Sequence, residues 1–144
     1  DIAVIPSKSI PQGIAALIAL NTEADFEMTT KKMKEALNTV RTGEVTHAIR
    51  DTVYGNLNIK KGEYICIIDG DLQVSGSALS RVLEDALKIM KTNNEGLVTL
   101  YRGESLDEAL MAILVEEMQE IFSGLEFEIH EGGQPVYDLI ISVE

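Results

Sequence analysis

Polar side chains that could take part in binding or catalysis gather in four short turn segments of this 144-residue chain. The segments span residues 6–13, 41–44, 50–52 and 131–135. They combine glycine with hydroxyl, amide and guanidinium groups, the mixture that often lines polar recognition sites on loops. The candidate residues for binding a partner or a ligand are Ser7, Lys8, Ser9, Gln12, Arg41, Thr42, Arg50, Asp51, Thr52, Glu131, Gln134 and Tyr137.

The first segment supports two interpretations. Ser7, Lys8 and Ser9 stand just before Pro11, which suits the first position of a helix. The first amides of a helix lack internal partners and its dipole presents positive charge there, so this turn could hold an anion such as a carboxylate. The same hydroxyls could simply cap the helix, and the sequence leaves both interpretations open.

The remaining polar residues have structural explanations as well. Arg50 and Asp51 could pair with each other at a strand end, which contributes only ~0.2 to 1 kcal/mol when exposed. The adjacent glycines 132 and 133 indicate a turn. His47 and His130 lie far apart in the sequence, and each is expected to be a packed or capped side chain.

No catalytic motif is present in the sequence. It contains no Walker-type loop, no G-x-G-x-x-G or G-x-S-x-G pattern, and no Cys/His cluster with metal-ligand spacing. We therefore expect no catalytic, cofactor-binding or metal-binding residues in this chain.

Length and composition are typical of one compact domain spanning 1–144. The chain is 45% hydrophobic and 25% charged, enough to bury a core. No apolar run is long enough to cross a membrane and no signal peptide is visible, which predicts a cytoplasmic location. The single cysteine, Cys66, lies in an apolar run and is expected to act as a small buried hydrophobe.

Charge is distributed unevenly along the chain. The formal net charge is -12, and residues 103–144 contain acidic side chains but no lysine or arginine. Because nucleic acids and anionic membranes require basic surfaces, neither is expected as a partner. A basic protein partner suits this surface better.

Hydrophobic periodicity predicts an α/β fold. Helices are expected over 11–20, over 30–40 after a cap at Thr29 or Thr30, over 78–90 after Ser77, and over 106–122 after a Ser105/Glu108 capping box. Strands are expected over 2–5, 44–50, 63–69, 72–74, 96–101, 125–131 and 137–143. Alternating helices and strands predict crossover connections and a mixed, mainly parallel sheet flanked by helices, with an antiparallel final strand. The apolar first helix is expected to be buried on most sides.

Three long segments carry a family resemblance. They are IPSKSIPQGIAAL at 5–17, TGEVTHAIRDT at 42–52, and EGGQPVY at 131–137 together with IISVE at 140–144. In this order they resemble the C-terminal domain of the A component of bacterial fatty acid kinase, a DAK2-type protein, over the whole chain. Position 47 is usually aromatic in that family, so His47 departs from its pattern.

The resemblance implies one module of a two-component fatty acid kinase. ATP and Mg²⁺ are then expected in an N-terminal domain of a longer, multidomain chain, consistent with a sequence that opens at Asp1 without methionine. The C-terminal domain is expected to contact the other kinase domains and to dock a DegV-type fatty-acid-binding protein. The acyl carboxylate of that partner is then phosphorylated for phospholipid synthesis. This domain alone would not be an enzyme.

The resemblance also leaves alternatives. The implied fold is similar to that of DegV proteins and the substrate subunits of dihydroxyacetone kinases. DegV proteins hold a carboxylate at an early strand-to-helix turn, so Ser7, Lys8 and Ser9 could form a small-ligand site for a fatty acid or another carboxylate. Dihydroxyacetone kinase substrate subunits capture a carbonyl covalently on a histidine, but neither histidine here matches that residue.

Overall fold

A computed structural model describes residues 1–91 and 93–144. The helices are α1 (Ile10–Ile18), α2 (Phe26–Ala36), α3 (Leu79–Met90) and α4 (Glu108–Ile121). The strands are β1 (Arg41–His47), β2 (Thr52–Tyr54), β3 (Leu57–Ile59), β4 (Tyr64–Ile68), β5 (Asp71–Gly76), β6 (Gly96–Arg102), β7 (Leu125–Glu131) and β8 (Leu139–Val143). Together they confirm the α/β class.

The main sheet has six strands in the order β5-β4-β1-β8-β6-β7. It is mixed, as predicted, but the expectation of a mainly parallel sheet is wrong, because only β6 and β7 pair in parallel. The α3 crossover does return β6 in the direction of β5. However, β4, β1 and β8 lie between them, so most neighbours are antiparallel. The final strand β8 is antiparallel to both neighbours, as expected, but these are β1 and β6, so β8 forms no hairpin with the preceding strand β7.

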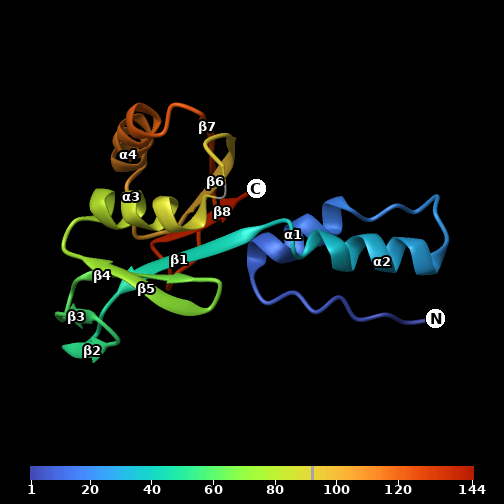
Figure 1. The fold of residues 1–144 in the computed structure, drawn as a ribbon, viewed down its shortest axis with the longest axis horizontal. Coiled ribbons are helices and arrows are strands. Elements are labelled where there is room, and N and C mark those ends of the chain that lie inside the picture. Colours follow the sequence, from blue (N-terminus) through green and yellow to red (C-terminus); the bar gives the residue numbers. More distant parts are fainter. Residues whose placement is uncertain (92) are drawn as a thin grey trace.

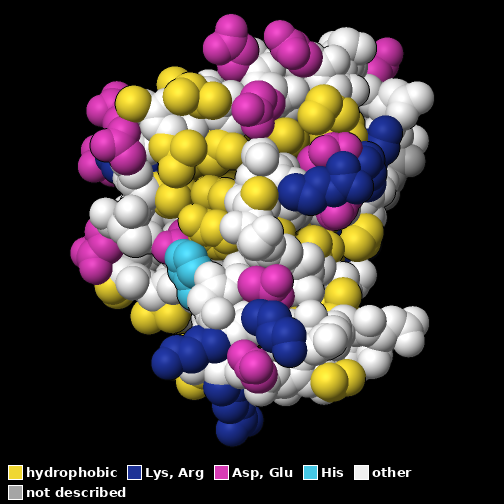
Figure 2. Space-filling model, turned by 90° about the vertical axis from the view of Figure 1, so that its left-hand side faces the viewer, with side chains coloured by type: hydrophobic (Ala, Val, Ile, Leu, Met, Phe, Trp, Pro, Cys, Tyr) yellow, Lys and Arg dark blue, Asp and Glu magenta, His cyan; other side chains and the backbone are white. Residues whose placement is uncertain are grey.

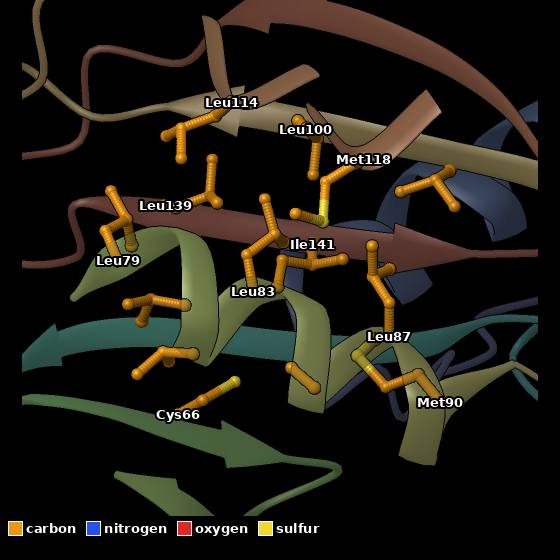
Figure 3. Packing of buried hydrophobic residues seen from close by; sticks show 14 of the residues in the cluster. Cys66, Leu79, Leu83, Leu87, Met90, Leu100, Leu114, Met118, Leu139 and Ile141 are labelled. Carbon is orange, nitrogen blue, oxygen red and sulfur yellow. The ribbon is translucent and has the colours of Figure 1, made fainter. Parts of the chain in front are cut away.

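Helices α3 and α4 cover one face of this sheet and form the core with it. Figure 3 shows Leu79, Leu83, Leu87 and Met90 of α3 packed toward the sheet, beneath Leu114 and Met118 of α4. The apolar residues of α3 recur every three or four positions, so one side of the helix faces the sheet. Cys66 lies in this core and is fully buried, which confirms its expected role.

Helices α1 and α2 extend from the body beside the start of β1 (Figure 1). The expectation that α1 is buried on most sides is wrong: Leu17 is 65% exposed and Ile18 is 79% exposed. Helix α2 buries none of its residues, and its cap is Asp25 instead of Thr29 or Thr30. Both helices pack mainly on each other and, through α1, on β1.

Three further expectations concern local structure. Residues 2–5 form no strand, because no neighbouring strand offers them hydrogen bonds and Ile2 is exposed. Residues 52–59 form the β2–β3 hairpin, where no strand was expected. Asp69 and Gly70 both have positive φ and join β4 to β5 in the tight turn between the strands expected over 63–69 and 72–74.

No helix in the described part of the chain is long and apolar enough to cross a membrane.

Candidate functional site

The structure separates most of the candidate residues into groups at opposite ends of β1. Strand β1 starts with Arg41 and Thr42, which lie beside the turn before α1. Its other end leads to residues 50–52, on the side where β6 and β7 also end. We call the first group the turn cluster (Lys8, Ser9, Gln12, Arg41, Thr42, Glu44 and Asp69). The second is the sheet-end cluster (His47, Tyr64, Arg102, Ser105, Glu131, Gln134 and Asp138).

In the turn cluster, the Ser9 side chain caps α1 and links the helix to the sheet. Ser9 Oγ accepts a hydrogen bond from the backbone N–H of Gln12 at 3.3 Å and lies 2.8 Å from Thr42 Oγ1. Gln12 Oε1 accepts from the Lys8 backbone N–H, and Gln12 Nε2 donates to the carbonyl of Leu37. These polar groups therefore hold the first helix, the loop before β1 and β1 together.

Carboxylates complete the turn cluster. Asp69 accepts hydrogen bonds from the Thr42 backbone N–H and from Arg41 Nε, each at 2.9 Å. Arg41 also donates to the carbonyl of Ile89 at the end of α3. Thr42, Glu44 and Asp69 line one cavity of about 130 Å³. Partial burial raises the pKa of Glu44.

This geometry distinguishes the two interpretations of the first segment. The Ser9 hydroxyl is engaged as a cap and cross-link, and a bound carboxylate would meet the acidic groups of Glu44 and Asp69. The cluster therefore supports the capping interpretation. Ser7 and Lys8 have exposed side chains at its edge.

The sheet-end cluster is built around the buried carboxylate of Asp138, just before β8. Its side chain is 8% exposed. Oδ1 accepts a hydrogen bond from the hydroxyl of Ser105. Oδ2 has no aligned hydrogen bond among the described residues, and His47 Nδ1 lies 2.8 Å away. Asp138 therefore joins the loop before α4 to the end of β1.

The imidazole of His47 is held from two sides. The Tyr64 ring lies 4.3 Å away between centroids, while Asp138 faces Nδ1. The His47 side chain is still 45% exposed. Because the carboxylate occupies the Nδ1 side, Nε2 is the ring nitrogen left for other contacts.

The fourth predicted segment supports this end of the sheet through its own bonds. Glu131 pairs with Arg102 at 3.0 Å, and Arg102 donates to the carbonyl of Leu106. Gln134 Nε2 donates to the carbonyl of Tyr101. Tyr137 is half-buried beside this network. These residues therefore fix the loop that carries Asp138.

The third predicted segment lies apart from that network. Of the two interpretations of Arg50 and Asp51, the structure does not support a mutual pair: the Asp51 carboxylate accepts a hydrogen bond from the Lys61 backbone N–H and lies 3.8 Å from Lys60 Nζ. Thr52 is exposed at the start of β2. Figure 2 shows this end of the molecule, with apolar side chains at its centre and both acidic and basic side chains around them.

The sequence did not single out His47, Ser105 and Asp138 as a group. They are distant in the chain, and only the folded sheet brings them together. One signal was available, because Asp138 is a charged residue directly preceding five buried apolar or small residues. A charge at such a position requires a buried partner.

The other histidine lies in a separate groove on the opposite face of the sheet. This groove has a volume of about 360 Å³ and is lined by Ile14, Leu97, Tyr101 and His130, among others. His130 stacks on Tyr101, and its Nε2 lies 3.4 Å from Glu128. Among described residues, no group of three or more His, Cys, Asp or Glu side chains is arranged to hold a metal ion.

Comparisons with known proteins found a matching family model and several similar proteins. The family model for FakA-like C-terminal domains, those of the A component of fatty acid kinase, matches residues 1–144. An uncharacterized protein of Staphylococcus aureus strain MRSA252 is 33% identical over 144 residues, and one of Staphylococcus epidermidis is 32% identical over the same length. The alignment covers 100% of this chain but 26% of each relative, so the chain spans about a quarter of their length.

Proposed function

The chain belongs to the FakA-like C-terminal family of fatty acid kinase domains, and from this membership we propose that it is the docking module of a fatty acid kinase. The module binds a DegV-type fatty-acid-binding protein and presents its acyl carboxylate to an ATP- and Mg²⁺-binding domain elsewhere in the full protein. The acyl phosphate formed there supplies phospholipid synthesis in the bacterial cytoplasm. The match over the entire chain is the observation that carries this proposal.

The arrangement of polar groups favours a docking role over a small-ligand role. A carboxylate ligand would have to approach Glu44 and Asp69 in the turn cluster. Docking instead uses the surface of a rigid sheet, and positioning two reacting groups is itself a large contribution to catalysis. The acidic last third of the chain suits a partner with a basic surface.

Isothermal titration of this domain with the acyl-loaded DegV-type protein from the same cell tests the proposal. We expect one-to-one binding with a micromolar or lower Kd. The absence of heat and of co-elution at high micromolar concentrations would contradict it. Repeating the titration at increasing salt tests the charge argument, since screening weakens attraction between exposed charges.

Titration with a fatty acid alone examines the small-ligand alternative. Lys8→Ala should leave folding unchanged, because the Lys8 side chain is exposed. If fatty acid shifts the amide signals of Ser7 to Gln12, and Lys8→Ala weakens that effect, the turn cluster is a carboxylate site and the capping interpretation of this turn is wrong.

A further inference from the structure

The sheet-end cluster contains a second arrangement of chemically active groups, independent of the turn cluster. His47, Asp138 and Ser105 come from three separate segments, and the central carboxylate is more than nine-tenths buried. A buried carboxylate with one oxygen satisfied by a hydroxyl and the other facing an imidazole requires an explanation, because burying a charge is costly unless it is paired.

The pair fixes the chemistry of the imidazole. In a neutral imidazole, a carboxylate 2.8 Å from Nδ1 favours the tautomer with its proton on Nδ1, and that tautomer has its lone pair on Nε2. The Tyr64 ring restricts the plane of the imidazole, and the Ser105 hydroxyl restricts the carboxylate. Nε2 is thus held as a base and nucleophile on a partly exposed side chain.

The N-terminus of helix α3 follows β5 on the face of the sheet that His47 shares. His47 shares its face of the sheet with Val45, which is buried beneath α3. Across the sheet, His47 pairs with Tyr64 and Tyr64 pairs with Gly76, after which α3 begins. Helix α3 has no side-chain cap and no acidic residue in its first turn, so the positive end of its dipole is not neutralised there.

We propose that His47 is a phosphoryl acceptor, with Nε2 as the nucleophile and Asp138 as the positioning residue. The lone pair of Nε2 attacks phosphorus in an activated phosphate, an N–P bond forms, and the bond from phosphorus to the leaving group breaks with its electrons on that group. The proton on Nδ1 stays with the imidazole beside Asp138. The choice of an acyl phosphate as the cellular donor rests on the proposed function. Its acyl group would leave as a carboxylate.

Phosphoramidate is the probe, because it donates a phosphoryl group with ammonia as the leaving group and needs no partner protein. The chain has two histidines, so His130 beside Glu128 is an internal comparison. We expect a single phosphoryl group, acid-labile, on Nε2 of His47, located by peptide mapping and ³¹P NMR. His47→Gln should abolish it, and His130→Gln should leave its rate unchanged.

Two variants test the role of Asp138 separately from folding. Asp138→Asn keeps the shape and should slow phosphorylation of His47 by roughly tenfold or more, the order expected when a group that orients an imidazole is lost. Glu128→Gln is the matched change beside His130 and should leave His47 unaffected. Ser105→Ala, which releases the carboxylate without removing it, should give a smaller decrease, with circular dichroism confirming the fold of each variant.

Several outcomes would overturn the assignment. These are equal rates at the two histidines, modification at Nδ1, or an unchanged rate in a folded Asp138→Asn. Failure here leaves the docking proposal intact, because docking is measured by titration with the partner. Conversely, a domain that does not bind the partner could still show selective phosphorylation of His47 by phosphoramidate.

Discussion

At the scale of single residues, Ser9 combines a helix cap with a cross-link to the sheet. Its side chain bonds to Gln12 N and Thr42 Oγ1, and the partner hydroxyl is buried. Ser9→Ala should lower the free energy of unfolding by about 1 kcal/mol, the usual effect of losing such a cap. Chemical denaturation measures it.

Ser7→Ala is the matched control for that change. Ser7 is exposed two positions earlier, so its substitution should stay within about 0.5 kcal/mol of the unsubstituted chain. Equal effects of the two substitutions would show that the cap assigned to Ser9 contributes nothing specific.

Cys66 gives a prediction about pH. Burial raises the pKa of its thiol from 9.0 to about 12. Because the unfolded state releases this proton at lower pH than the folded state, the thiol contributes no pH dependence below pH 9. Stability should then fall as pH rises from 9 toward 12. The free energies of unfolding of this chain and of Cys66→Ala, each measured by denaturation from pH 8 to 11, should diverge above pH 9. The same pH dependence for both would contradict the prediction.

The same burial limits the reactivity of Cys66. A thiol that stays protonated is a poor nucleophile, so a maleimide reagent should modify the folded protein far more slowly than the unfolded chain at pH 7.5. Cys66 therefore serves in packing, whereas the partly exposed side chain of His47 can react.

At the scale of elements, the loop between β6 and α4 approaches the loop before β8 very closely. A side-chain carbon added at Gly103 would collide with the carbonyl oxygen of Tyr137 and lie 3.0 Å from that of Asp138. Gly103 N also donates to the carbonyl of Asp138 at 2.9 Å. This close approach is what allows Ser105 to reach the carboxylate of Asp138.

Gly103→Ala should therefore destabilise the fold by about 2 kcal/mol or more, as expected when backbone must move. Gly13→Ala is the control: its added carbon would lie 3.8 Å from Ser7 Oγ inside α1, and helix propensity predicts a gain of about 0.5–1 kcal/mol. Thermal unfolding followed by circular dichroism distinguishes the two, and a neutral Gly103→Ala would contradict the close packing of these loops.

Elements were also the scale at which sequence reasoning was most successful. Strong local signals predicted α3, α4 and the β4–β5 turn, because their apolar spacing and turn residues are local properties. The predicted caps were wrong: α3 has no side-chain cap from Ser77, and Asp107 caps α4 in place of Ser105. The strand expected at 2–5 failed because β-branched residues form a strand only when a neighbour provides hydrogen bonds. The prediction of a mainly parallel sheet failed for a similar reason, since periodicity does not show which strands lie between β5 and β6.

The candidate site was predictable only in part. Ser9 and Thr42 were both identified from their residue types, and the fold brings them within hydrogen-bonding distance. The pairing of His47 with Asp138 depends on tertiary contacts between residues 91 positions apart, which no spacing rule detects. Histidine 47 on a strand therefore looked like an ordinary packed residue until its neighbour was known.

At the scale of the whole molecule, α1 and α2 differ from the body in how they are held. Helix α3 buries six residues against the sheet, whereas α2 buries none. Local opening costs little where little apolar surface is covered, so the amides of α2 should exchange with deuterium on the order of a hundredfold faster than those of α3. Hydrogen-exchange mass spectrometry of this chain measures both helices in one sample.

The two helices have similar lengths, 11 and 12 residues, so α3 is a fair internal control. Equal protection of both helices, lost at the same denaturant concentration, would show instead that α1, α2 and the sheet unfold as one cooperative unit.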